Sequence, residues 1–118
     1  MSSKLTRNAP YLVAGILTCA AIGVAIAPRG AFAAGAPVAA KIANFAFGPP
    51  TITVHAGTAV TWTNSDDDPH TVVADAGAFK SKALDTGDTF TQTFSTPGTY
   101  SYHCSLHPYM VGKVVVQR

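Results

Sequence analysis

The sequence predicts an all-β protein that forms one small sandwich domain over residues 34–118. Seven short runs of residues alternate apolar and polar side chains or are rich in β-branched residues. Gly, Pro and Asp separate these runs, and only residues 75–85, which form a loop or a single helical turn, interrupt the strand pattern. In order, the runs are residues 41–47, 51–55, 58–64, 70–74, 88–95, 99–104 and 112–117.

The first three runs have the period of two that is typical of a strand with one buried face. Gly48-Pro49-Pro50 ends the first run and Ala56-Gly57 ends the second. The polar residues 64–69, which include three consecutive Asp, form a turn after the third. The apolar residues on which this pattern rests are Ile42, Phe45, Ile52, Val54, Val60 and Trp62.

The later runs complete the two sheets. Residues 70–74 are a short β-branched run, residues 88–95 alternate Thr with inward residues, and residues 112–117 are a closing strand rich in Val. Pro97-Gly98 forms the turn before residues 99–104. The inward side chains of the fifth and sixth runs are Phe90, Phe94, Tyr100, Tyr102 and Cys104.

Residues 1–33 have the layout of a secretory signal peptide. Lys4 and Arg7 give a positive start, residues 11–27 are almost entirely apolar, and Ala31-Phe32-Ala33 is a small-residue cleavage signature. We therefore expect cleavage near Ala33 and export to the periplasm. The alternative is an uncleaved membrane anchor, but the apolar run is shorter than the roughly 20 residues of a spanning helix.

Removal of this leader changes the charge of the chain. The full sequence has a formal net charge of +2, whereas residues 34–118 have five basic residues and six Asp, or about −1. This balance argues against nucleic acid or an anionic membrane as a partner, and we expect a monomer. The five basic residues are Lys41, Lys80, Lys82, Lys113 and Arg118.

A cluster of metal ligands lies near the C-terminus. Cys104, His107 and Met110 follow the spacing Cys-x-x-His-x-x-Met. A thiolate and imidazoles with a weak thioether ligand are typical of a copper electron-transfer centre, whereas a structural zinc site takes four strong ligands. Cys104 is the only cysteine after residue 33. An intermolecular disulfide and an inert buried thiol are the alternatives, but ligation explains the neighbouring ligands better.

The period of two decides which other histidine joins this cluster. His103 points away from Cys104 on its strand, and His55 follows the inward Val54, so we expect both at the surface. His70 follows Pro69 at the start of an apolar run, where a fixed backbone directs its ring inward. The predicted metal ligands are His70, Cys104, His107 and Met110.

Three segments resemble the cupredoxins, or small blue copper proteins, and most of all the amicyanins. They are Asp68-Pro-His-Thr-Val-Val, Pro97-Gly-Thr-Tyr-Ser-Tyr-His-Cys-Ser-Leu-His-Pro-Tyr-Met and Val111-Gly-Lys-Val-Val-Val. The resemblance runs from about residue 40 to residue 116, and the two-residue gap between His107 and Met110 is similar to that of amicyanins. It implies a Greek-key β-sandwich that binds one copper ion, with His70, Cys104 and His107 as equatorial ligands and Met110 as the axial ligand.

The chain departs from the family at one position beside the site. Relatives usually have Asn directly after the first ligand His, where it ties the two ligand loops together and donates a hydrogen bond near the cysteine sulfur. Thr71 occupies that position here. Because the groups around metal ligands tune the metal strongly, we expect the reduction potential to depend on what this hydroxyl does.

The function implied is that of a periplasmic shuttle of single electrons. We expect His107, Leu106, Pro108 and Tyr109 to form an apolar docking patch, or simply to cover the copper from water. The resemblance implies redox protein partners such as a dehydrogenase donor (methylamine dehydrogenase in amicyanin-like proteins) and a c-type cytochrome acceptor.

Two other functions compete with the shuttle. A copper carrier without redox turnover favours exposed Met and His clusters, but Met110 is the only methionine after the leader. An enzyme needs further copper ligands; multicopper oxidases have His on both sides of the cysteine, whereas Ser105 follows Cys104 here. We therefore expect an electron-transfer protein without enzymatic activity.

Polar groups outside the ligand set have open interpretations. The acidic residues 66–68 form a solvated turn or an acidic rim for a basic partner. Lys80 and Lys82 are, in the same way, a basic contact for an acidic partner. The Tyr100 hydroxyl ties a crossover between the sheets, or the ring only packs in the core.

Overall fold

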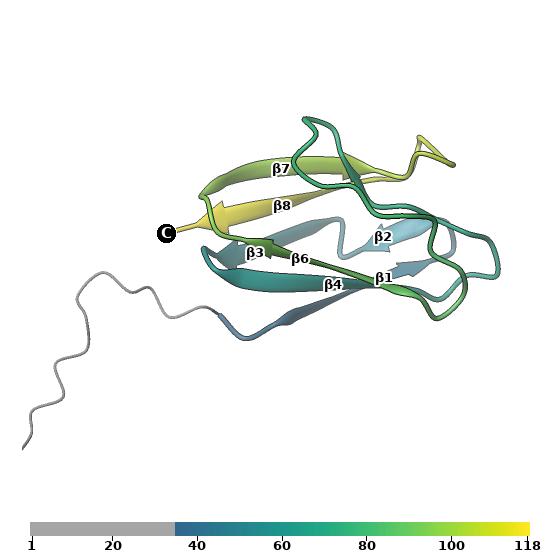
Figure 1. The fold of residues 1–118 in the computed structure, drawn as a ribbon, viewed down its shortest axis with the longest axis horizontal. Helices are drawn as coiled ribbons and strands as arrows, with labels where there is room; N and C mark the ends of the chain where they lie inside the picture. Colours follow the sequence, from purple (N-terminus) through teal and green to yellow (C-terminus); the bar gives the residue numbers. More distant parts are fainter. Residues whose placement is uncertain (1–34) are drawn as a thin grey trace, which may run out of the picture.

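A computed structural model describes residues 35–118, which form a Greek-key β-sandwich (Figure 1). The predicted leader, residues 1–33, lies outside the described residues. The all-β prediction is confirmed, and the described part of the chain contains no helix that is long and apolar enough to cross a membrane. The strands are β1 Val38–Ala43, β2 Ala46–Gly48, β3 Thr51–His55, β4 Thr58–Asn64, β5 Val73–Ala74, β6 Thr89–Phe94, β7 Gly98–His103 and β8 Val111–Gln117.

The strands form two sheets of four. One sheet has the order β2-β1-β4-β6 and the other has the order β3-β8-β7-β5. β1 pairs in parallel with β4, and β3 pairs in parallel with β8, while the remaining pairs are antiparallel. The chain passes from one sheet to the other after β2, β3, β4, β5 and β6, so strands that are far apart in the sequence become neighbours.

Two of the predicted runs differ from the observed strands. Residues 41–47 were expected as one run, but Asn44 and Phe45 have φ angles of 53° and 56° and reverse the chain between β1 and β2. A two-residue hairpin of this kind needs positive φ at both positions and usually contains Gly, so Asn-Phe gives little sign of it. Of residues 70–74 only Val73–Ala74 is a strand, and His70 forms an isolated bridge with Leu84.

An aromatic cluster fills the space between the sheets. Trp62 on β4 is fully buried, and its indole N–H donates to the Tyr102 hydroxyl over 3.3 Å. Burial raises the pKa of Tyr102, so the phenol stays neutral. The alternation along β7 is confirmed, because Tyr102 and Cys104 are buried while Ser101 is exposed. The rings that pack on Trp62 are Phe79, Phe90, Phe94 and Tyr102.

The Tyr100 side chain has both of the roles proposed for it. Its hydroxyl donates to the Thr96 carbonyl oxygen over 2.7 Å, which ties the crossover between β6 and β7. Its ring also packs edge-on against Phe94 at a centroid distance of 5.2 Å. The crossover is therefore fixed at the end of the sandwich where β7 begins.

Three loops meet at the end of the sandwich where β4 and β7 end. Residues 65–72 follow β4, residues 104–110 follow β7, and both lie at the end of the sandwich away from the C-terminus (Figure 1). Residues 84–88 join them, because the Gly87 N–H donates to the Asn64 carbonyl oxygen and the Leu84 N–H donates to the His70 carbonyl oxygen. The candidate ligands are carried by two of these loops.

A substitution at Gly112 tests the packing of the core. Gly112 lies opposite Tyr102 in the β7–β8 pair, and a methyl group at Gly112 would lie 2.6 Å from the Tyr102 ring. Because this ring is buried, we expect Gly112→Ala to lower the free energy of unfolding by about 1–3 kcal/mol in a denaturant titration. In a Tyr102→Leu background the same change is expected to cost much less. An equal cost in both backgrounds would show that the ring is not the cause.

Candidate metal centre

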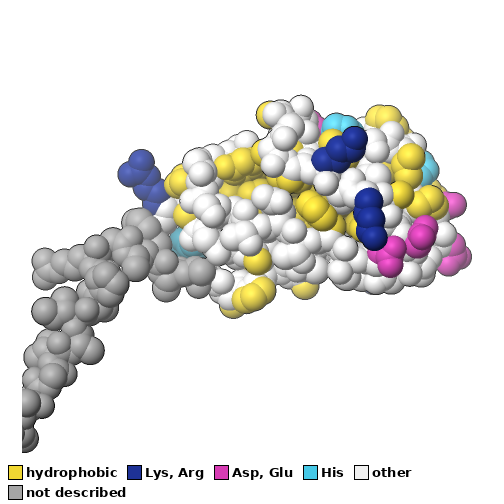
Figure 2. Space-filling model, viewed as in Figure 1, with side chains coloured by type: hydrophobic (Ala, Val, Ile, Leu, Met, Phe, Trp, Pro, Cys, Tyr) yellow, Lys and Arg dark blue, Asp and Glu magenta, His cyan; other side chains and the backbone are white. Residues whose placement is uncertain are grey.

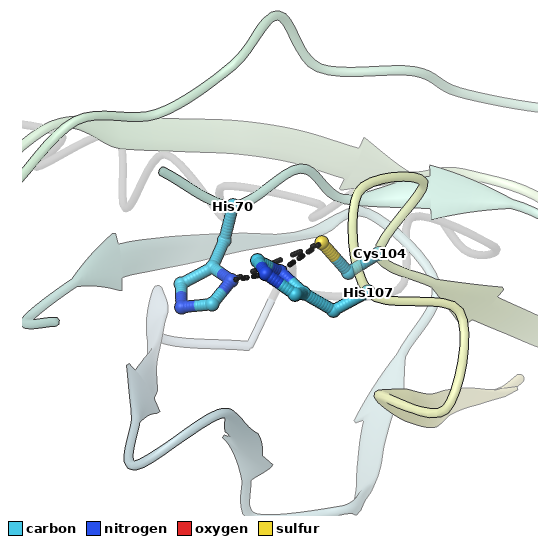
Figure 3. A group of neighbouring side chains, drawn as sticks. All are labelled: His70, Cys104 and His107. Carbon is cyan, nitrogen blue, oxygen red and sulfur yellow. Dashed lines mark hydrogen bonds between the residues drawn. The ribbon is translucent and has the colours of Figure 1, made fainter. Parts of the chain in front are cut away.

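Three side chains from two loops converge at the end of the sandwich. His70, Cys104 and His107 point toward one another (Figure 3). The two imidazole Nδ1 atoms lie 3.2 Å apart, and the Cys104 Sγ lies 3.9 Å from Nδ1 of His70 and 3.8 Å from Nδ1 of His107. His70 and Cys104 are fully buried, whereas His107 is partly exposed.

The triangle of donor atoms has the size that a metal ion requires. From its three edges, the point equidistant from the donors lies about 2.1 Å from each, close to typical metal–imidazole and metal–thiolate distances of about 2.0–2.3 Å. One thiolate and two imidazoles suit copper or zinc. The residues present therefore fit a metal ion without rearrangement.

The loop after β7 is closed by its own backbone. The Cys104 N–H donates to the Met110 carbonyl oxygen over 3.1 Å, and the Met110 N–H donates to the His107 carbonyl oxygen over 2.9 Å. Met110 is 2% exposed, so its side chain lies in the interior at this end of the sandwich. The three predicted ligands of this loop are thus held in one short hydrogen-bonded ring.

The Cys104 sulfur has an environment that favours the thiolate. Burial raises its pKa, but hydrogen bonds from the Thr71 N–H, at 3.3 Å, and from the His107 imidazole outweigh burial and lower the pKa to about 6. A low pKa is what a metal-binding cysteine needs, because only the thiolate ligates strongly.

Thr71 takes over the link between the two ligand loops. Its Oγ1 accepts the Ser105 N–H over 2.7 Å, lies 2.8 Å from the Ser105 hydroxyl and lies 3.7 Å from the Cys104 Sγ. The hydroxyl joins the two loops, while the closest contact to the sulfur comes from the Thr71 backbone N–H. The hydroxyl has a single hydrogen, so it donates either to the sulfur or to Ser105.

His70 is held by both its backbone and its ring. Its backbone exchanges two hydrogen bonds with Leu84, of 3.1 and 2.7 Å. Its Nε2 lies 2.9 Å from the Asp66 carboxylate. The three acidic residues 66–68 therefore have different environments. Asp67 and Asp68 are exposed, whereas Asp66 faces a candidate ligand. In the sequence, the four-residue separation of Asp66 and His70 is a sign of this contact. It was not predicted because the polar residues around Asp66 also fit a solvated turn.

The other two histidines lie away from this group. The His103 side chain is 32% exposed, and its Nδ1 lies 2.6 Å from the Asp75 carboxylate. His55 is exposed at the end of β3, where its Nδ1 lies 3.3 Å from the Arg118 carbonyl oxygen. Both histidines were expected at the surface, and the structure places them there.

Two aromatic rings lie beside the partly exposed His107, Phe45 at a centroid distance of 5.2 Å and Tyr109 at 6.2 Å. Leu106, Tyr109 and Phe45 are 50%, 69% and 37% exposed. We call these three residues with Pro108 the apolar patch. Figure 2 shows hydrophobic, histidine and acidic side chains gathered at this end of the molecule. Phe45 was not expected in this patch, because it belongs to the predicted run 41–47.

Comparison with known sequences gives one consistent family. Residues 15–116 match the family model of the cupredoxin-like domain. Amicyanin-alpha from Methylorubrum extorquens is 42% identical over 82 residues, which cover 65% of this chain and 69% of that protein. A chloroplastic plastocyanin from Tetradesmus obliquus is 36% identical over an alignment that covers 98% of this chain and 92% of that protein.

Solved structures give the same result for the fold. A Cu(I) form of an amicyanin variant has a TM-score of 0.66 and 35% sequence identity. The match covers 69% of this chain and 82% of the amicyanin chain. A copper-containing nitrite reductase from Thermus scotoductus has a TM-score of 0.66 and 30% identity, but the match covers only 22% of that enzyme.

The lowered thiol pKa predicts how the stability of the metal-free protein depends on pH. The pKa of Cys104 is about 6 in the folded chain and about 8.5 in an unfolded one. Between these values the unfolded chain binds the additional proton, so the thiolate's contribution to the free energy of unfolding is expected to rise with pH. It is complete above about 8.5 and lost as the pH falls through about 6.

The contribution is measured as the difference between the wild type and Cys104→Ser in denaturant titrations across this range. The serine hydroxyl does not titrate there, so ionisable groups that do not contact the sulfur cancel in the difference. A difference that stays constant with pH would contradict the low pKa.

Proposed function

The chain belongs to the cupredoxin family, and we propose that it is a type 1 (blue) copper protein that carries single electrons between redox partners in the periplasm. The observation that supports this most strongly is the triangle of donor atoms from His70, Cys104 and His107, whose size fits a bound metal ion. In this proposal these three residues are the equatorial ligands of one copper ion, and the buried Met110 supplies the weak axial thioether.

The copper supplies a one-electron Cu(II)/Cu(I) couple, and the protein supplies a site that does not move. Transfer is fast when the ligands keep their positions in both oxidation states. Backbone hydrogen bonds hold the 104–110 loop, and Thr71 joins it to the loop of His70. The buried sulfur and the buried His70 ring exclude water from the ligands.

Electrons are proposed to pass through His107. It is the only partly exposed residue among the four proposed ligands, and its edge lies within the apolar patch. A partner that covers this patch removes water from the shortest path between its own cofactor and the His107 ring. The same side chains also cover the site from solvent, so the docking and covering roles are compatible.

The burial of the site argues against the competing functions. A catalytic metal keeps a coordination position open to substrate, but three of the four proposed ligands here are at most 2% exposed. A carrier that delivers copper needs ligands that a recipient protein can reach. The related nitrite reductase matches over 22% of its length, so its likeness extends to one domain of a much longer chain.

A coloured, redox-active copper site is the first test of this proposal. We expect the wild type to bind one copper ion, to be intensely blue, and to bleach and recover through cycles of ascorbate and oxidant. Cys104→Ala is expected to remove the blue colour and to weaken copper binding by more than the roughly 10–100-fold effect of losing an outer-shell partner. Titration with visible spectroscopy measures both.

Met110→Leu is the matched control. The substitution keeps the volume of the side chain and removes only the weak axial ligand, so the blue colour is expected to persist with a changed reduction potential. A wild-type copper complex that stays colourless, or one that ascorbate does not bleach reversibly, would refute the electron-transfer function.

We also propose that residues 1–33 are a cleaved export signal and that residues 34–118 are the mature copper domain. Its redox partners are proposed to be a dehydrogenase donor and a c-type cytochrome acceptor, and the mature protein is proposed to be a monomer. When the full chain is expressed in a Gram-negative host, we expect the protein in the periplasmic fraction. Its mass is expected to match a chain whose first residue is Ala34. Full-length protein in the membrane fraction would instead indicate an uncleaved anchor.

A further inference from the structure

The Asp66 carboxylate joins the turn between β1 and β2 to the ring of His70. Its Oδ1 accepts the Asn44 N–H over 2.7 Å, and its Oδ2 accepts the Phe45 N–H over 2.9 Å. The same Oδ2 lies 2.9 Å from Nε2 of His70. The Asp66 side chain is only 12% exposed and the His70 side chain is fully buried, so three N–H groups converge on one largely buried carboxylate.

The contact with His70 determines which ring nitrogen carries the proton. A neutral imidazole has one N–H and one lone pair. A carboxylate accepts hydrogen bonds and does not donate them, so it selects the tautomer with the proton on Nε2. The lone pair is then on Nδ1, which is the atom that faces His107 Nδ1 and Cys104 Sγ.

The contact with the β1–β2 turn positions an aromatic ring. Asn44 and Phe45 both have positive φ, a conformation that a bulky residue such as Phe rarely adopts without outside support. Asp66 supplies that support by accepting both of their N–H groups. The Phe45 ring then lies edge-on to both imidazoles, with centroid distances of 5.2 Å to His70 and 5.2 Å to His107.

We propose that Asp66 is a positioning residue for both imidazoles of the site. It holds His70 directly, through the Nε2–H, and it holds His107 indirectly, through the Phe45 ring that the turn places against it. That the two imidazoles ligate copper rests on the proposed function, whereas their placement in the metal-free protein does not.

The test compares Asp66→Ala with Asp67→Ala. The control changes the net charge equally, and Asp67 is exposed with no side-chain hydrogen bond to any of residues 35–118. The first readout is nitrogen-15 NMR of the metal-free proteins. We expect the wild type and the control to show one His70 tautomer with a slowly exchanging Nε2–H. We expect Asp66→Ala to lose that signal and the protection of the Phe45 N–H.

The second readout is the copper affinity of the same proteins. Loss of a group that orients a ligand typically weakens metal binding by about 10–100-fold, so this loss is expected for Asp66→Ala and not for Asp67→Ala. A His70 tautomer and a copper affinity that both match the control would overturn the proposal. If copper binds without blue colour in every protein, the electron-transfer function fails while the NMR result still decides the role of Asp66.

Asp66→Asn keeps the proposal testable if the alanine variant does not fold. An amide has one oxygen where the carboxylate has two, so it cannot accept all three N–H groups. At least one of the Asn44 N–H, the Phe45 N–H and the His70 Nε2–H is then expected to exchange faster than in Asp67→Asn. Unchanged exchange at all three would overturn the proposal.

Discussion

The buried sulfur of Cys104 is the constraint on which the rest of the site depends. The alternation along β7 that buries Tyr102 also directs Cys104 between the sheets, where a thiolate without partners is unfavourable. The Thr71 N–H and the His107 imidazole supply those partners. The need to stabilise this sulfur therefore brings the two ligand loops together at one end of the sandwich.

The loops around the sulfur are fixed by hydrogen bonds to neighbouring loops and, in the 104–110 loop, by hydrogen bonds within the loop. Leu84 holds the His70 backbone, Thr71 joins Ser105, and Met110 closes the loop onto Cys104. The first two contacts join segments from different parts of the chain, so the donor atoms cannot easily move apart one at a time. A preorganised site of this kind suits a redox role, because little rearrangement accompanies the change in charge.

The sequence was sufficient to predict the sandwich, the alternation of β4 and β7, and the spacing that brings His70, Cys104 and His107 together. Each of these depends on a local pattern that a period of two or a short motif makes visible. The hairpin at Asn44 and Phe45 was not predicted, because the left-handed conformation is held by Asp66, 22 residues away in the sequence from Asn44. The contact between Asp66 and His70 was missed for a related reason, since it depends on where a turn aims one side chain.

Crystal structures of the metal-free and copper-loaded protein test most directly whether the fold preforms the metal site. We predict that the two Nδ1 atoms and the Cys104 sulfur differ by less than about 0.5 Å between the two structures, with copper bonded to all three. A copper ion bound elsewhere, or a donor side chain that turns into place only when copper is added, would contradict the account.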